Sequence, residues 1–196
     1  MSGSDGSLAQ KFGQIDIYLF DQLLKDRIRS TDRVLDAGCG SGRNLLYLMR
    51  MGCRVSAVDM NPEAVAGVRE LAHELQTGLP DENFRVEPVE TLSFNDAAFD
   101  VVLSCAVLHF AKDAAHFRAM VSEMWRVLRP GGMLWARLAT GGGIHFGLGG
   151  AQFSYLSTPE ELEALTESLG GQLLDPIKTT VIHRSRSMTT WVARKN

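Results

Sequence analysis

Short apolar runs alternate with longer amphipathic segments along most of the chain. Apolar runs rich in strand-forming residues predict buried strands, at 32–38, 53–59, 83–89, 99–105 and 133–139. Apolar residues at helical spacing predict helices, over 13–28, 43–52, 61–75, 113–128 and 158–171. Two last strands, about 172–183 and 187–194, lie close enough along the chain to pair antiparallel.

Capping residues mark where several of these helices begin. Asn61 stands at the cap of one helix and Pro62 at its first position. Thr158 and Glu161 have the spacing of a capping box at the start of another helix. The segment RPGG, residues 129–132, breaks the helix before it and starts the next strand.

Strands that alternate with helices predict an α/β fold with a mostly parallel, doubly wound sheet covered on both faces. Neither repeats nor linkers divide the chain, so we expect one domain over 1–196. Within it, residues 1–10 form a flexible polar leader, and the long glycine-rich stretch 140–157 is a candidate lid. Ligands of such folds bind at the carboxyl ends of the strands.

Composition narrows the class of protein further. The 196 residues are 45% hydrophobic and 22% charged, as expected of a globular domain, and the formal net charge is -3. This charge gives no attraction to nucleic acid or to an anionic membrane, and neither is expected as a partner. Three scattered cysteines predict neither disulfides nor a metal site. With no signal peptide or apolar span in the sequence, we expect a cytoplasmic protein.

The segment VLDAGCGSGRN, residues 34–44, places three glycines at alternate positions after the first predicted strand. This spacing differs from the dinucleotide fingerprint, which has two residues before its third glycine, and no Lys-Ser or Lys-Thr pair makes it a P-loop. Asp36 precedes the glycines, and a carboxylate about 4 Å from a phosphate costs about 4 kcal/mol at an effective dielectric near 20. The turn therefore favours a ligand with positive charge and without phosphate.

S-adenosylmethionine meets both conditions, because it carries a sulfonium and an α-ammonium, and its carboxylate suits the helix end. Asp36 would attract the ammonium directly or through water. Asp59 ends the second predicted strand, 21 residues after Gly38. A carboxylate at that place accepts hydrogen bonds from both ribose hydroxyls.

Four ordered blocks make the chain similar to the class I S-adenosylmethionine-dependent methyltransferases over about residues 30–195. These blocks are VLDAGCGSGRN, VSAVDMNPEAV, LSFNDAAFDVVLSCAVLHF and MWRVLRPGGMLWARL. The resemblance implies a Rossmann-like sheet of seven strands whose last strand is antiparallel. It also implies S-adenosylmethionine as cofactor and S-adenosylhomocysteine as product.

The resemblance further implies which residues contact the cofactor. The methionine part would be held by Asp36, Gly38, Cys39, Gly40 and Gly42, with Ser104 beside it. Asp59 would bind the ribose, and Met60 would pack on one adenine face. The aspartate that often reads the adenine amine in this family is replaced here by Pro88. The backbone of Val89 and the carboxylate of Glu90 are the candidates that remain.

Two shorter segments, GSGRN and SMTTWVARKN, are similar to the small tellurite-resistance-type methyltransferases, which methylate oxyanions and small nucleophiles. Arg43 in the first segment would pair with the cofactor carboxylate or with an acidic substrate. The alternative is a solvated helix residue. Cys39 stands between two glycines, where its small side chain fits. For Cys105, a role of the thiol in the chemistry of the site stays open. His73 and His116 are expected on helix surfaces.

Three residues are candidates for catalysis, namely His109, His145 and Tyr155. His109 follows the fourth strand, where it would orient or deprotonate a nucleophile. The alternative is a histidine that caps a helix or packs against the sheet edge. His145, Phe146 and Tyr155 belong to the glycine-rich stretch, where aromatics either shield the sulfonium from water or simply fold onto the core.

The function that these features favour is methyl transfer to a small-molecule acceptor by in-line displacement. A non-catalytic module that binds S-adenosylmethionine or a protein partner is the alternative from another class. A dinucleotide oxidoreductase is disfavoured by Asp36. The acceptor and the oligomeric state are left open by the sequence.

Overall fold

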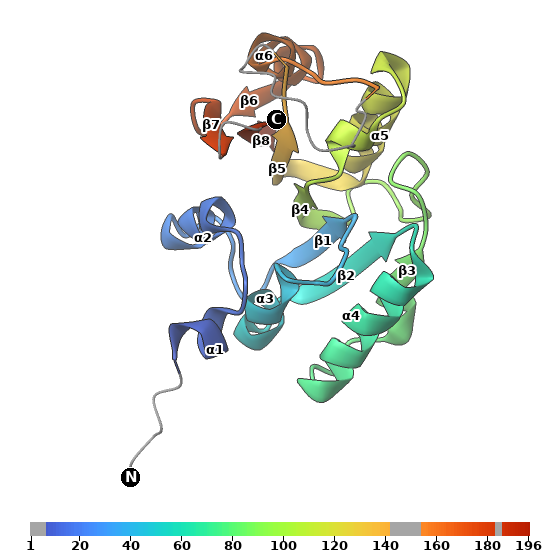
Figure 1. The fold of residues 1–196 in the computed structure, drawn as a ribbon. Helices are drawn as coiled ribbons and strands as arrows, with labels where there is room; N and C mark the ends of the chain where they lie inside the picture. The colour runs from blue at the N-terminus through green and yellow to red at the C-terminus, as the bar shows by residue number, and fades with distance from the viewer. Residues whose placement is uncertain (1–6, 142–153, 183–185) are drawn as a thin grey trace.

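The computed structural model describes residues 7–141, 154–182 and 186–196. Seven strands lie side by side in the order β3-β2-β1-β4-β5-β8-β6 (Figure 1). They are β1 Arg33–Ala37, β2 Arg54–Asp59, β3 Phe84–Val86, β4 Phe99–Cys105, β5 Leu128–Ala139, β6 Gly171–Leu173 and β8 Arg186–Lys195. From β3 to β5 neighbours are parallel, and β8 is antiparallel to β5. The predicted Rossmann-like sheet is confirmed.

The predicted strand over 172–183 is two strands in the structure. β6 pairs with one end of β8, and β7, Lys178–Ile182, pairs with the other end, so β7 is an eighth strand outside the order above. Pro176 lies between β6 and β7, and a proline has no N–H for the ladder. The prediction of one continuous strand is wrong, whereas the antiparallel pairing with the last strand is confirmed.

Helices cover both faces of the sheet. Successive side chains along a strand point to opposite faces, so each strand contributes to a core on either side. Val34 belongs to the core beneath α2 Ile17–Leu24, α3 Leu45–Met51 and α4 Pro62–Glu74. Leu35 belongs to the opposite core, beneath α5 Ala114–Val127 and α6 Pro159–Ser168. The predicted double winding is therefore present, with α5 and α6 close together in Figure 1.

The predicted caps hold α4 and α6 in place. Asn61 Oδ1 accepts a hydrogen bond from Glu63 N–H at 3.0 Å. Thr158 Oγ1 accepts from Glu161 N–H at 3.2 Å, and Glu161 Oε2 accepts from Thr158 N–H at 2.9 Å. Both helices then begin at the proline that follows the cap, at Pro62 and Pro159. These boundaries are confirmed.

The first predicted helix, over 13–28, is shorter in the structure. Asp16 caps α2 by accepting from Tyr18 N–H at 2.9 Å, and the helix ends at Leu24, before Asp26 with φ +53°. Residues of the predicted leader also take part in helical structure, since α1 spans Leu8–Phe12. None of the helices within the described ranges has the length and apolar character that a membrane span requires.

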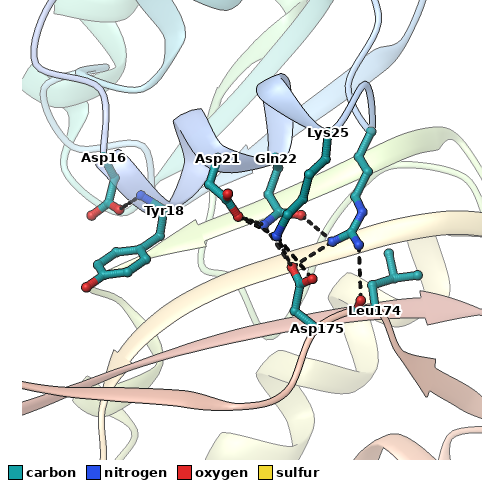
Figure 2. A network of polar contacts seen from close by, with 8 residues as sticks. Asp16, Tyr18, Asp21, Gln22, Lys25, Leu174 and Asp175 are labelled. Carbon is teal, nitrogen blue, oxygen red and sulfur yellow. Dashed lines mark hydrogen bonds and ion pairs between the residues drawn. The ribbon is translucent and has the colours of Figure 1, made fainter.

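A charged network fastens α2 to the connection between β6 and β7. Asp175 lies opposite α2 and faces Gln22 and Lys25 (Figure 2). Its carboxylate accepts from Gln22 Nε2 at 3.0 Å, Lys25 Nζ at 3.2 Å and Arg27 Nη1 at 2.6 Å. Arg27 Nη2 also donates to the Leu174 carbonyl at 3.1 Å. The network holds α2 beside a cleft of about 720 Å³ that α2 forms with β7 and β8.

Candidate functional site: a pocket at the carboxyl ends of β1, β2 and β4

The glycine-rich turn after β1 folds back on β2. The N–H groups of Gly38 and Cys39 both donate to the Val58 carbonyl at 2.9 Å. Gly38 has φ +83°, and a Cβ there would lie 2.3 Å from Val107 Cγ2. Gly40 has φ +49°, and a Cβ there would meet nothing within 4 Å. The turn thus packs closely at Gly38 and presents bare backbone to open space at Gly40.

Asp59 ties this turn to the end of β2. Its Oδ2 accepts a hydrogen bond from Gly40 N–H at 2.8 Å, and its Oδ1 accepts from Asn61 N–H at 2.9 Å. Both oxygens keep a second lone pair, because each carboxylate oxygen can accept more than one hydrogen bond. Asp59 therefore fixes the shape of the turn and still faces the pocket that Gly40 lines.

Asp36 is a buried acid without a partner. Only 1% of the residue is exposed, and Oδ1 has no hydrogen-bond partner within the described residues. Burial raises the pKa of Asp36 from 3.8 to about 7, the charge of Arg43 lowers it, and the charge of Asp59 raises it. Ser104 Oγ, at the end of β4, is also buried without a partner in this part of the chain. Such orphaned groups are what a polar ligand satisfies.

A pocket of about 410 Å³ opens beside these residues, at the carboxyl edge of the sheet. The residues lining it come from the turn, the end of β2, the loop after β3, the end of β4 with the segment that follows it, and α5. They are Gly38, Gly40, Asp59, Met60, Val89, Glu90, Cys105, Ala106, Val107, Phe110, His116 and Met120. Met60 is 72% exposed and Phe110 65% exposed, so the pocket offers large apolar side chains to a planar ligand.

His116 belongs to this pocket, so its prediction as a surface helix residue is wrong. Its Nε2 lies 3.1 Å from Glu90 Oε1, and its Nδ1 accepts from Lys112 N–H at 3.1 Å. The reason is its place in the first turn of α5, which starts at the edge where β4 ends. Asp113, the cap of α5, was the signal in the sequence that could have placed His116 there.

Arg43 reaches across to the end of β4. Its Nη2 donates to Cys105 Sγ at 2.9 Å and lies 3.7 Å from Asp16 Oδ2. Arg137 Nε approaches the same Asp16 oxygen at 3.2 Å. Burial raises the pKa of the Cys105 thiol more than the charge and hydrogen bond of Arg43 lower it, so the pKa is raised overall. Cys105 is therefore a neutral thiol at neutral pH, and Cys39, whose pKa burial also raises, is one too.

The candidate catalytic residues are not brought together in the described part of the chain. His109 is 6% exposed, and its Nδ1 accepts from Ala139 N–H at 3.1 Å beneath the end of β5. Tyr155 donates to Glu161 Oε2 at 3.2 Å and packs on Phe117, in a separate pocket next to α6. His145, Phe146 and most of the candidate lid lie outside the described residues. Their catalytic roles stay predictions.

The fold and the pocket together define a class of protein. A parallel sheet with a glycine-rich turn after β1, an acid at the end of β2 and a pocket over these strand ends is a Rossmann-like arrangement for a nucleoside-containing cofactor. Of the residues predicted to bind the cofactor here, Gly38, Gly40 and Asp59 line this pocket, whereas Asp36 and Gly42 do not line it, and their roles in cofactor binding stay predictions.

Comparison with known proteins identifies the family. Residues 35–136 match the family described as "Methyltransferase domain", and the chain belongs to this family. It is 38% identical over 104 residues to the ubiquinone biosynthesis O-methyltransferase of Methylocella silvestris, which covers 53% of this chain and 38% of that protein. The chain thus spans well under two thirds of the length of this relative.

Solved structures with the same fold have lower sequence identity. TehB from Haemophilus influenzae has a TM-score of 0.72 at 21% identity, over 90% of this chain and 62% of TehB. The 1,6-didemethyltoxoflavin-N1-methyltransferase of Burkholderia thailandensis, solved with bound 1,6-didemethyltoxoflavin and S-adenosylhomocysteine, has a TM-score of 0.70 at 21% identity. That match covers 97% of this chain and 81% of the other. At this identity the likeness concerns the fold.

Proposed function

We propose that this chain binds S-adenosylmethionine in the pocket at the carboxyl edge and transfers its methyl group to a small-molecule acceptor. The buried carboxylate of Asp36, whose Oδ1 has no hydrogen-bond partner among the described residues, and the open backbone at Gly40 carry this proposal. A buried acid is unfavourable without a partner, and an α-ammonium supplies one. Membership of the methyltransferase domain family supports the same ligand.

Each part of the cofactor has residues that suit it. Asp36 and Ser104 take the methionine part together with the backbone of Gly38, Cys39, Gly40 and Gly42. Asp59 accepts from the ribose, Met60 packs on the adenine, and Val89 N–H and Glu90 face its polar edge. When bound, the cofactor supplies a methyl group activated by its sulfonium. The chain's own task is then to hold the acceptor in line and keep water out.

A row of side chains crosses the sheet from this pocket to the larger cleft. Cys105 pairs in register with Arg137 on β5, Arg137 with Thr190 on β8, and Thr190 with Lys178 on β7. At about 4.8 Å between strands, the row is roughly 14 Å long. The Tyr18 ring lies over it, 4.3 Å from Arg137 and 5.1 Å from Lys178.

We place the acceptor along this row and expect it to carry an acidic group. Arg43, Arg137 and Lys178 bring three cations to the row, and Asp16 is the carboxylate that pairs with the two arginines. An anionic acceptor is therefore attracted to this face. Two of the relatives named above are an O-methyltransferase of ubiquinone biosynthesis and an N1-methyltransferase solved with 1,6-didemethyltoxoflavin, which supports a small acceptor over a nucleic acid.

The test is a transfer assay with methyl-labelled S-adenosylmethionine and phenols offered with and without a ring carboxylate. We expect labelled product, more from the acidic phenols, and loss of cofactor binding in Asp59→Ala. S-adenosylhomocysteine binding without transfer to any acceptor would favour the non-catalytic alternative instead. Binding of neither cofactor form would contradict the proposal.

A further inference from the structure

A second pocket, of about 390 Å³, lies at the amino edge of the sheet, opposite to the edge where S-adenosylmethionine is placed. Asp100 and Arg129 line it from the first residues of β4 and β5, and Asp32 lines it from just before β1. Arg194 on the antiparallel strand β8 pairs in register with Met133 and so reaches the same edge. This pocket is therefore distinct from the site at the carboxyl edge.

Most of the side chains around this second pocket are charged, and positive charge is in excess. In the described part of the chain, five basic and three acidic residues line it, namely Lys25, Arg27, Arg29, Arg129 and Arg194 against Asp26, Asp32 and Asp100. The whole chain has a formal net charge of -3, so this is a positive site on a negative protein. A pocket of this kind attracts an anion.

The acid between the strands is already shared by two arginines. Asp100 Oδ2 accepts from Arg33 N–H at 2.8 Å and from Arg33 Nε at 3.0 Å, and Oδ1 accepts from Arg129 Nε. One carboxylate thus balances only one of two guanidinium charges. Arg129 Nη1 donates to the Pro130 carbonyl at 2.9 Å, and the guanidinium keeps further N–H groups for another acceptor.

Two other arginines bring guanidinium groups that are free. Arg29 and Arg194 are exposed, and in the part of the chain that the structure describes neither guanidinium forms a hydrogen bond or an ion pair. Lys25 Nζ and Arg27 Nη1 differ, because they lie 3.2 Å and 2.6 Å from the carboxylate of Asp175. A guanidinium can bind a phosphate group through two parallel N–H···O bonds. Arg29 and Arg194 are therefore the donors available to a ligand.

We propose that this pocket binds a small molecule through a phosphate or diphosphate group, which Arg29, Arg194 and Arg129 hold. A phosphate monoester carries nearly two negative charges at neutral pH and three acceptor oxygens, which suits several arginines better than a single carboxylate does. The volume of about 390 Å³ is in the range of small-molecule sites and leaves room for the rest of the ligand. Of the described residues, none lines both this pocket and the one at the carboxyl edge, so both ligands can bind together.

Calorimetric titration with pyrophosphate tests the proposal, in a phosphate-free buffer whose ionic strength NaCl holds constant. We expect one site with a Kd below about 1 mM. Arg29→Gln and Arg194→Gln should each weaken binding about threefold and the double variant about tenfold, because charge-assisted hydrogen bonds are lost. Arg118→Gln, at an exposed arginine of α5 outside this pocket, should keep the wild-type affinity.

Asp26 supplies a variant whose expected effect has the opposite sign. This exposed acid lines the pocket and has φ +53°, a conformation that Asn also adopts. Asp26→Asn therefore removes a negative charge without straining the backbone, and pyrophosphate should bind about twofold more tightly. A variant that only disturbed the fold would not improve binding.

Four results would overturn the proposal. The first is no pyrophosphate binding by wild-type protein that thermal melts show to be folded, and the second is an unchanged affinity in the folded double variant. The third is displacement of pyrophosphate by S-adenosylhomocysteine, which would place it in the pocket at the carboxyl edge. The fourth is a hexaglutamate peptide that binds as tightly as pyrophosphate, which would identify an acidic protein segment as the ligand.

Discussion

Asp36 should destabilise the ligand-free protein, so replacing it with Asn should make the fold more stable. The residue is 1% exposed, and its Oδ1 has no partner in the described structure. Asn keeps the shape of the side chain and removes the charge. A residue that destabilises the ligand-free protein and stabilises the ligand-bound protein is typical of a binding site.

The size of the effect follows from the pKa of Asp36, which burial raises from 3.8 to about 7. As the pH rises, the Asp36 carboxyl group loses its proton at a lower pH in the unfolded chain than in the folded protein. The free energy of unfolding therefore falls progressively between pH 3.8 and pH 7, and this loss is constant above pH 7. A shift of about 3 pH units corresponds to about 4 kcal/mol at pH 8. At pH 5 about 2 kcal/mol of this remains.

Urea unfolding of the wild-type chain and Asp36→Asn at pH 5 and pH 8 measures this directly. We expect the variant to be more stable than the wild type by about 4 kcal/mol at pH 8 and by only about 2 kcal/mol at pH 5. Glu163→Gln, an exposed control on α6, should show no such change with pH. A stability difference between Asp36→Asn and wild type that is equal at both pH values would refute the reasoning.

Three further outcomes follow from the same structure. S-adenosylhomocysteine affinity should fall up to about tenfold between pH 7 and pH 6, because Asp36 must lose its proton to pair with the ammonium, and calorimetry should show Asp36→Asn without this dependence. Gly38→Ala should lower the free energy of unfolding in urea by about 2 kcal/mol or more, because the new Cβ collides with Val107 at φ +83°. In Gly40→Ala the space around the Cβ is open, so a smaller loss in Gly38→Ala than in Gly40→Ala would contradict this. Burial raises the pKa of Asp100, but hydrogen bonds from Arg33 and Arg129 outweigh it and lower the pKa to about 2, so about 2 kcal/mol of stability is lost as the pH falls from 3.8 to 2. Acid titration of Asp100→Asn should lack that loss.

The fold could be predicted from the sequence because its elements carry strong local signals. The apolar runs of β1, β2 and β4 and the caps of α4 and α6 are local in sequence, and each is where it was expected. The prediction was wrong where one residue breaks a pattern. Pro176 splits the strand that pairs with β8, and Asp16 starts α2 later than its apolar stripe suggested.

The candidate site was predictable where its residues lie next to a strand end. Asp36, the glycines and Asp59 follow β1 and β2 directly, so their meeting at one edge follows from the parallel sheet. His116 could not be placed in this way, because its contact with Glu90 depends on how α5 packs over the pocket. His109 shows the converse, since its position after β4 suggested chemistry while its ring accepts from the backbone of β5.

The central claim, that the pocket binds S-adenosylmethionine, is tested most directly by calorimetric titration with S-adenosylhomocysteine, with NADH as the parallel control. We predict micromolar binding of S-adenosylhomocysteine and none of NADH, because Asp36 attracts an ammonium and repels a pyrophosphate. Failure to bind S-adenosylhomocysteine, or equal binding of NADH, would contradict the assignment of this pocket.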